Sequence, residues 1–504
     1  MPVSSGVVKT MLFMTTVEQE RLVEVDAVEA PVRKRVPVGA GKTFRRYDQG
    51  QVLLMAPSIQ DWVPDGHLAR FVSDLVDEAL DLSAIYAAYE EERGFPPYDP
   101  RLMVKLLIYG YATGTPSSRK LEERTYCDVA VRFLCADQHP DFRPIARFRK
   151  RHLPALADLF VQALRLCRQA GLVGLGTLAL DGTKVRANAS RHKAMSYERM
   201  VAKEAQLEAE IAAIRANARA LLADAEQVDA DEDERFGADR RGDELPEDLQ
   251  RREDRLARIR QAKQALEDQA RAAETARRAE MAEQGKTPRQ PPNGRDPFAP
   301  KAKAQRNFTD PDSKIMKTAD GAFHQCYNGQ AVVDATAQVI VGCSLSNAAP
   351  DAQQLEPALD ALAANLEAID AQLPEGAALA ADTGYFSEHN IVVTAEHGLD
   401  AHIATGKTKH DDPPPIAPRG PIPKDATPKQ RMARKLKTKH GHAVYRQRKT
   451  IVEPVFGQLR TVQDAGRVLL RGAPAADLQW RFSCTIHNLL KLHRNGGLAA
   501  ITAP

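Results

Sequence analysis

Cysteine is scarce in this sequence and never occurs in the pairs that hold metal or redox centres. The six cysteines form no CxxC pair, and no Cys/His cluster has zinc-finger spacing. Isolated thiols of this kind are typical of a reducing compartment. Long apolar runs are missing too, since no segment reaches the roughly 18 apolar residues that a membrane helix needs. The sequence therefore argues against a zinc-finger module, a disulfide framework and a membrane protein, and predicts a cytoplasmic one.

A strong excess of one charge is also missing. The 70 Lys and Arg residues nearly balance the 67 Asp and Glu residues, so the net charge of +3 by itself neither indicates nor excludes a nucleic-acid partner. The charges are unevenly distributed, however, because residues 406–449 are strongly basic and residues 224–248 are strongly acidic. A solvated loop is the default interpretation of the basic run, and contact with phosphates is its alternative.

The N-terminal third is predicted to be helical. Residues 1–47 look like an irregular leader, and residues 48–170 carry apolar positions at helical spacing. Asp99 followed by Pro100 is a good start signal for one helix, and residues 154–170 form another amphipathic stretch. This pattern predicts an all-helical N-terminal domain.

Strand-like sequence then alternates with helices. Residues 171–195 contain an apolar strand that is expected to end at Asp181-Gly182. Residues 304–494 contain a predicted hairpin, a short strand before Asp382 and several amphipathic helices. Residues 196–284 lie between these two segments and contain two heptad-patterned arms, which predict an antiparallel, coiled-coil-like helical hairpin. A linker follows at residues 285–303. The overall expectation is an α/β core with a long helical insertion.

Three acidic residues have settings in which metal chemistry is possible. Asp181 and Asp382 each follow an apolar strand core, and Glu453 lies in a predicted helix with Lys449 one turn before it. Taken singly, each Asp more often closes a turn, and Glu453 more often forms a surface ion pair with Lys449. Together, two strand-end Asp residues and a helical Glu form an all-oxygen donor set suited to hard cations, with no His or Cys that would favour zinc or copper. A pair of Mg²⁺ ions at such a site can clamp the attacking and leaving oxygens of a phosphodiester.

Five ordered segments make a resemblance specific. The sequence resembles the DDE transposases of bacterial insertion sequences, related to the insertion-sequence four/five superfamily, over roughly residues 48–494. The matching segments are Leu180-Asp-Gly-Thr-Lys184, Tyr327-Asn-Gly-Gln-Ala-Val332, Ala381-Asp-Thr-Gly-Tyr385, Val452-Glu-Pro-Val-Phe-Gly457 and His487-Asn-Leu-Leu-Lys-Leu492. Residues 100–110 also resemble the N-terminal domain of that family.

The resemblance implies a fold and a site. The core would be an RNase H-like mixed sheet, with Asp181, Asp382 and Glu453 as the catalytic acids and the ligands of two Mg²⁺ ions, for which Mn²⁺ can substitute. Lys449 and Arg460 fit the two basic places around the Glu, and Arg446 and Arg448 add to the expected DNA-binding set. Tyr445 is one residue early for the Tyr place of related families, where Arg446 stands, so Tyr445 is not counted with the site.

The implied activity is Mg²⁺-dependent cleavage at the ends of an insertion sequence, followed by strand transfer into target DNA. The partners would be double-stranded DNA, both terminal inverted repeats and target, bound through the N-terminal helices and the basic segment. The protein would act near the nucleoid as a homodimer or larger assembly on DNA, without a membrane. Two alternatives stay open: an RNase H-like nuclease that hydrolyses without joining, and a non-catalytic DNA-binding remnant of a mobile element.

Overall fold

The computed structural model describes residues 58–89, 97–190, 193–236, 247–283, 285–288, 296–406 and 417–502, with no side-chain description for 217–236 and 247–250. The predicted leader 1–47 and part of the basic run 406–449 lie outside these residues. Residues 58–504 form one unit of the chain, and the rest of this section concerns that unit. Within the described part, no helix is long and apolar enough to cross a membrane.

Helices make up the N-terminal part of this unit. They are η1 (Ile59–Trp62), α1 (Leu68–Asp74), η2 (Leu75–Ala79), α2 (Ser83–Tyr86), α3 (Pro100–Ala112), α4 (Ser118–Cys127), α5 (Val129–Leu134), α6 (Phe142–Arg151) and α7 (Leu153–Gln169). The predicted start of α3 is confirmed, because the Asp99 side chain accepts a hydrogen bond from the Arg101 backbone N–H and Pro100 opens the helix.

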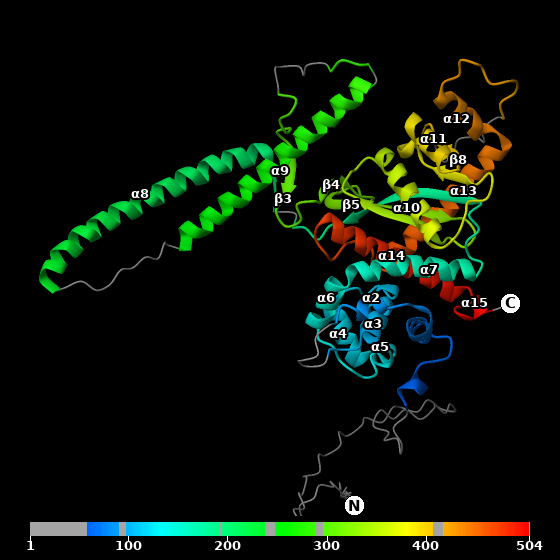
Figure 1. Ribbon diagram of the computed structural model, residues 1–504, viewed down its shortest axis with the longest axis horizontal. Helices are drawn as coiled ribbons and strands as arrows, with labels where there is room; N and C mark the ends of the chain where they lie inside the picture. The colour runs from blue at the N-terminus through cyan, green and yellow to red at the C-terminus, as the bar shows by residue number, and fades with distance from the viewer. Residues whose placement is uncertain are drawn as a thin grey trace, which may run out of the picture. The chain divides into compact units, whose positions relative to one another are not determined.

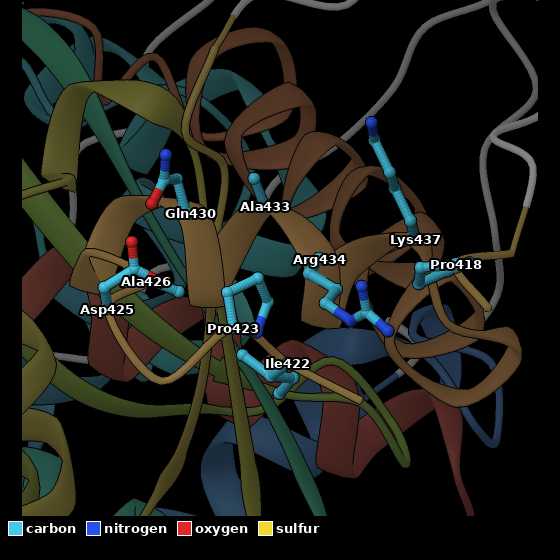
Figure 2. A pocket seen from close by; sticks show the side chains of 9 residues that line it. All are labelled: Pro418, Ile422, Pro423, Asp425, Ala426, Gln430, Ala433, Arg434 and Lys437. Atoms are coloured by element: carbon cyan, nitrogen blue, oxygen red, sulfur yellow. The ribbon is translucent and has the colours of Figure 1, made fainter. Parts of the chain in front are cut away.

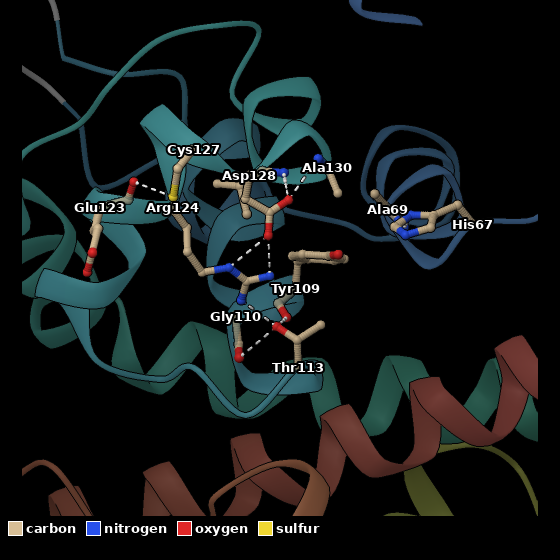
Figure 3. A network of polar contacts seen from close by, with 11 residues as sticks. His67, Ala69, Tyr109, Gly110, Thr113, Glu123, Arg124, Cys127, Asp128 and Ala130 are labelled. Carbon is tan, nitrogen blue, oxygen red and sulfur yellow. Dashed lines mark hydrogen bonds and ion pairs between the residues drawn. The ribbon is translucent and has the colours of Figure 1, made fainter. Parts of the chain in front are cut away.

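One arginine connects three of these helices through polar contacts (Figure 3). Arg124 of α4 donates to Thr113 Oγ1 at the end of α3 at 2.7 Å and to Asp128 Oδ2 at 2.7 Å. Asp128 in turn caps α5 by accepting from the Ala130 N–H at 2.9 Å. The guanidinium also lies over the Tyr109 ring, 5.3 Å from its centroid. These contacts hold α3, α4 and α5 in a fixed arrangement.

A mixed sheet forms the centre of the unit. Its strands are β1 (Thr177–Arg186), β4 (Lys314–Lys317), β5 (Phe323–Asp334), β6 (Ile340–Ser346), β7 (Ala378–Ala381) and β8 (Asp400–Ile403). The order is β4-β5-β1-β7-β8, with β6 also paired to β5. β1 pairs antiparallel with β5 and parallel with β7, and β7 pairs parallel with β8. β1 is therefore the central strand, where the antiparallel part of the sheet meets the parallel part.

Helices cover both faces of this sheet. A Cβ at Gly329 of β5 would lie 2.9 Å from the Trp480 ring of α14 (Ala473–Arg494), whereas one at Gly342 of β6 would lie 3.2 Å from Leu362 of α10 (Leu355–Ala368). Gly342 pairs with Val332, three residues from Gly329 and so on the opposite face of β5. α14 and α10 thus pack on opposite faces. α7 lies alongside α14 (Figure 1), and Tyr111 of α3 meets Phe482 edge to face at 5.0 Å.

The remaining elements follow the sheet in sequence. They are η5 (Asp351–Gln354), η6 (Thr383–Tyr385), α11 (Glu388–Glu396), α12 (Pro428–Lys437), α13 (Lys439–Gly457), η7 (Gln458–Val462) and α15 (Ala499–Thr502). The predicted hairpin is confirmed as β5 and β6, and the predicted strand before Asp382 is confirmed as β7. Asn488 of α14 bonds both backbone groups of Ile340, which ties α14 to β6.

Two long helices, α8 (Tyr197–Phe236) and α9 (Glu247–Glu283), occupy the insertion, flanked by the paired strands β2 (Ala194–Ser196) and β3 (Gln305–Asn307). Heptad residues that include Met200, Leu207, Leu256 and Ile259 are buried between them. Glu204 of α8 pairs with Arg260 of α9, and Arg215 pairs with Glu253, so the sequence positions run in opposite directions along the contact. Of the acidic stretch that was expected to separate the two arms, residues 229–248, the part at 237–246 lies outside the described residues.

One strand boundary was predicted wrongly. β1 does not end at Asp181-Gly182 but continues to Arg186, because β5 goes on pairing with it as far as Cys326. Gly182 is needed for close approach and not for a turn, since a Cβ there would lie 2.6 Å from Nε2 of Gln330. Asp181 is consequently a mid-strand residue, paired with Ala331 of β5 just beyond the point where the pairing with β7 ends.

Candidate active site

The register of the parallel strands brings two of the predicted acids together. Leu180 of β1 pairs with Ala381 of β7, so Asp181 and Asp382 are the next residues on two adjacent strands. β7 ends there, and Asp382 begins the η6 turn by accepting a hydrogen bond from the Gly384 N–H at 2.8 Å. The carboxyl end of a parallel strand is where α/β sheets bind ligands. The two carboxylates therefore lie side by side where the parallel pairing stops.

The Asp181 carboxylate is partly shielded from solvent and paired with a cation. Its Oδ1 accepts from the Gly182 N–H at 2.8 Å, and its Oδ2 accepts from Nη1 of Arg448 at 2.9 Å. The side chains of Arg448 and Asp181 are 11% and 23% exposed, so this ion pair is sheltered from water. Burial raises the pKa of Asp181, Arg448 opposes the rise, and the neighbouring Asp382 adds to it. An ionised Asp181 thus depends on a cation beside it.

Arg448 is presented by α13, which packs against β1 and β7. Val444, Ile451, Val452 and Val455 are buried and anchor this face of the helix. Tyr445 lies one turn before Arg448 on the same face. Burial raises the pKa of Tyr445, Arg448 opposes this rise, and both Asp382 and Asp181 add to it. Tyr445, which the sequence spacing left out, is therefore a neighbour of both carboxylates.

Glu453 has a different environment from the two Asp residues. Its side chain is exposed and forms no hydrogen bond or ion pair with any described residue. Across the described part of the chain, no group of three or more His, Cys, Asp or Glu side chains is arranged to hold a metal. The structure thus brings together Asp181 and Asp382 but leaves Glu453 apart from them.

The four basic residues expected at the site also divide into two pairs. Arg448 contacts Asp181, and Nη2 of Arg460 donates to Thr183 Oγ1, two residues further along β1. Arg446 and Lys449 are exposed and form no hydrogen bond or ion pair with any described residue. Arg448 and Arg460 therefore lie against β1 on the side of Asp181, and Lys449 does not.

Sequence reasoning missed a buried polar cluster behind Gly182, on the opposite face of β1 from Asp181. The Tyr385 hydroxyl donates to Gln330 Oε1, and Asn328 Nδ2 donates to Asp351 Oδ1 at 2.7 Å. Lys184 Nζ also donates to Asp351 Oδ1, at 3.1 Å. Burial raises the pKa of Tyr385 well above its usual range, and Asp351, Asp181 and Asp382 raise it further. The Tyr-Asn-Gly-Gln and Thr-Gly-Tyr segments were the available signal for this cluster.

This cluster ties the η6 turn to the sheet. Asn328 and Gln330 are fully buried, and Asn328 Oδ1 and Gln330 Nε2 have no partner among the described residues. A Cβ at Gly384 would lie 3.0 Å from Asp382 Oδ1 and 3.4 Å from Asp351 Oδ2, so these two carboxylates flank the same glycine. The segment that carries Asp382 is thereby fixed relative to β1 and β5.

A separate pocket lies away from the acidic pair. It is formed by the segment before α12 and one side of that helix (Figure 2). Its lining includes Pro418, Ile422, Pro423, Gln430, Arg434 and Lys437. The lining contains neither Asp181 nor Asp382, so this pocket is not part of the candidate site.

Comparisons with known families agree with the resemblance read from the sequence. Residues 57–151 match the model of a transposase domain (DUF772), and residues 422–493 match the model of a transposase DDE domain. No curated protein and no solved structure matches the chain. The second match covers Arg448, Glu453 and Arg460, whereas Asp181 and Asp382 lie between the two matched segments. Taken together, the two matches support a DDE transposase of an insertion-sequence family.

Proposed function

We propose that this protein cuts DNA at the ends of an insertion sequence and joins the freed ends to target DNA, in a reaction that depends on Mg²⁺. The observation that carries the proposal is the adjacency of Asp181 and Asp382 on neighbouring parallel strands, with the basic helix α13 against them. Two carboxylates beside phosphate-binding cations are the arrangement that phosphodiester chemistry requires.

The residues at this place suit a hard divalent cation. The donors are carboxylate oxygens, and burial raises the pKa of Asp181, so that its ionised form gains from a cation at that position. Asp181 and Asp382 would hold the metal. Two Mg²⁺ ions, when bound, would activate water or a 3′ hydroxyl and stabilise charge on the transferring phosphate. Glu453 is assigned as a third ligand by the family resemblance alone.

The protein groups around the pair have separate tasks in this proposal. Arg448 neutralises Asp181 and lies beside the phosphate that the site would bind, while Arg460, held at Thr183, would contact a phosphate further along β1. Arg446 and Lys449 are exposed on α13 and would contact DNA that lies along this helix. The buried contacts of Tyr385 and Gln330 would keep Asp382 in place during the reaction.

The wider architecture is part of the same proposal. A six-stranded sheet, in which the antiparallel strands β4, β5, β6 and β1 are continued by β7 and β8 in parallel, with helices on both faces, supports an RNase H-like core. The proposal keeps the predicted domain boundaries, including the helical hairpin at 196–284. The N-terminal helices would bind the terminal repeats. The protein would act as a homodimer or larger assembly on DNA, at the nucleoid.

A strand-transfer assay tests the proposed function. The full-length protein would be incubated with Mg²⁺, a duplex carrying the sequence that flanks the reading frame, and a target plasmid. Joined products with the wild type, and none with Asp181→Asn or Asp382→Asn, are expected. Nicked or cut DNA without joined products would favour the nuclease alternative. Full activity of Asp181→Asn would overturn the site, and inactivity of the wild type with both DNA molecules would favour the non-catalytic alternative.

A further inference from the structure

Helix α6 carries more positive charge than its place in the fold requires. Its ten residues, Phe142 to Arg151, include five cations and no carboxylate. The buried side of the helix is formed by Ile145, Phe148 and Arg149. The other cations are exposed, and three of them, Arg143, Arg147 and Lys150, follow one another at i, i+4 and i+7. They form a single stripe along the solvent side of the helix, which we call the α6 stripe.

No acidic side chain among the described residues neutralises the stripe. Arg147 and Lys150 form no hydrogen bond or ion pair with any described residue. Arg143 lies over the Phe142 ring at 5.4 Å, and Arg119 of the adjacent α4 lies over the same ring at 5.0 Å. The nearby acids are engaged with backbone groups, since Asp141 caps α6 and Glu122 accepts from the Phe142 N–H.

The stripe is also held rigidly. Arg149, a cation of α6 that is not part of the stripe, is only 6% exposed and points inward. It donates to Pro116 O at 2.6 Å and to Ser118 Oγ at 2.9 Å, which fixes α6 to the start of α4. Arg151 at the helix end donates to Ala88 O and lies over the Tyr89 ring. Two cations of α6 thus serve the fold, and the three of the stripe do not.

Like charges at i, i+3 and i, i+4 destabilise a helix, so a stripe of cations without an anionic partner lowers the stability of α6. Three cations over about 10 Å of helix are about 5 Å apart, a charge density of the same order as that of one DNA strand, which carries a phosphate about every 3.4 Å of axis. Guanidinium groups also bind phosphate oxygens in pairs.

We propose that the α6 stripe is the surface by which the N-terminal domain contacts the sugar-phosphate backbone of duplex DNA. The proposal deepens the proposed function, on which it rests for the identity of the anion. It places a backbone contact within the segment matched by the transposase domain, on a different helix from the cations of α13. Because phosphate contacts carry no sequence information, the stripe would position the duplex and not select its sequence.

The test compares two double variants of the full-length protein. Arg147→Gln/Lys150→Gln removes the two stripe cations without protein partners. Arg255→Gln/Arg258→Gln removes two exposed cations of α9 that have the same i, i+3 spacing and likewise contact no described residue. Binding to a fluorescent random-sequence duplex would be measured by anisotropy over a range of salt concentrations. Melting curves would verify that both variants fold like the wild type.

The slope of log Kobs against log salt is expected to fall in magnitude by about 1.8 in the stripe variant, because each phosphate contact contributes about 0.9. At about 0.1 M salt, this corresponds to a loss of affinity of roughly 60-fold. The α9 variant should keep the wild-type slope. An unchanged slope in the stripe variant, or an equal change in both variants, would overturn the proposal.

The same measurement separates this proposal from the proposed catalytic function. Asp181→Asn is expected to retain the wild-type salt slope while losing cleavage and joining. A wild type that binds through the stripe but never cuts DNA would refute the catalytic proposal and leave the stripe standing. A stripe variant that cuts and binds DNA like the wild type would refute the stripe proposal and leave the catalytic proposal standing.

Discussion

The guanidinium of Arg448 lies 2.9 Å from Oδ2 of Asp181, although 267 residues separate the two in the sequence. This ion pair joins the helix that carries Glu453 to the central strand of the sheet. It places a fixed positive charge on a carboxylate whose pKa burial raises, at the position where we propose a metal binds. The contact therefore bears on both the charge of the site and the orientation of α13.

Loss of the Arg448 cation should weaken catalysis most at low pH. In Arg448→Gln the pKa of Asp181 would rise further, because the group that opposes the effect of burial is gone. Activity at neutral pH is expected to fall about tenfold or more, since a hydrogen bond to a charged group contributes ~1.5–3 kcal/mol. The acidic limb of the pH–rate profile should move to higher pH. Arg258→Gln, which removes an exposed cation of α9, is the control and should keep the wild-type profile.

Neutralising Asp181 should stabilise the metal-free fold. Burial raises the pKa of Asp181 in the folded protein above its ordinary value, so the folded protein holds this proton more tightly than the unfolded chain. The free energy of unfolding therefore falls as pH rises from the pKa of Asp181 in the unfolded chain through its pKa in the folded protein, and it stays lower at higher pH. Urea unfolding with a chelator present should show Asp181→Asn to be more stable than wild type near pH 7, with the difference shrinking toward pH 4. Asp254→Asn, an exposed control on α9, should show no such pattern.

Mg²⁺ should raise the melting temperature of the wild type, because a ligand that binds only the folded state stabilises it, by about 2.7 kcal/mol at 100 times its Kd. The effect should disappear in Asp181→Asn and Asp382→Asn. Glu453→Gln should keep most of it without DNA, since Glu453 is exposed and apart from the pair. Glu367→Gln on α10 is the exposed control. Complete loss of the Mg²⁺-induced rise in melting temperature in Glu453→Gln would contradict a metal site formed by Asp181 and Asp382 without Glu453.

Gly182→Ala should destabilise the protein. The new Cβ would lie 2.6 Å from Gln330 Nε2, 3.1 Å from the Tyr385 hydroxyl and 3.2 Å from Asn328 Oδ1, all within the buried cluster. Overpacking of this kind costs ~1–3 kcal/mol, measurable by denaturant unfolding. Gly176→Ala is the matched control, because Gly176 is exposed and a Cβ there meets nothing within 4 Å. Equal stability of the two variants would argue against tight packing behind Asp181.

Tyr385→Phe should leave Gln330 Oε1 without its donor inside the sheet. A buried acceptor that loses its partner costs about 1–3 kcal/mol. If the contact also positions Asp382, strand transfer should require more Mg²⁺ for half-maximal rate, an effect that lowered stability alone would not produce. Tyr126→Phe changes an exposed tyrosine of α4 and should alter neither measurement. An unchanged Mg²⁺ requirement in Tyr385→Phe would restrict Tyr385 to a structural role.

Several elements of the fold were predictable because they depend on local patterns. The Asp99-Pro100 start of α3, the β5–β6 hairpin and the strand end before Asp382 follow from capping, turn chemistry and apolar runs that a short window contains. The family resemblance rested on short ordered segments, which sequence also contains. The extent of β1 was not predictable in this way, because pairing with β5, over 140 residues later, carries the strand past Gly182.

The sequence by itself determined which acids and cations could take part: Asp181 and Asp382 after apolar strands, and a run of basic residues before Glu453. Only the tertiary structure decided which of them meet. Successive residues of a helix point about 100° apart, so the burial of Val444, Ile451, Val452 and Val455 turns Arg448 and Tyr445 toward Asp181 and leaves Lys449 and Glu453 in solvent. That rotation is set by packing against β1 and β7, distant in sequence, and no local pattern encodes it.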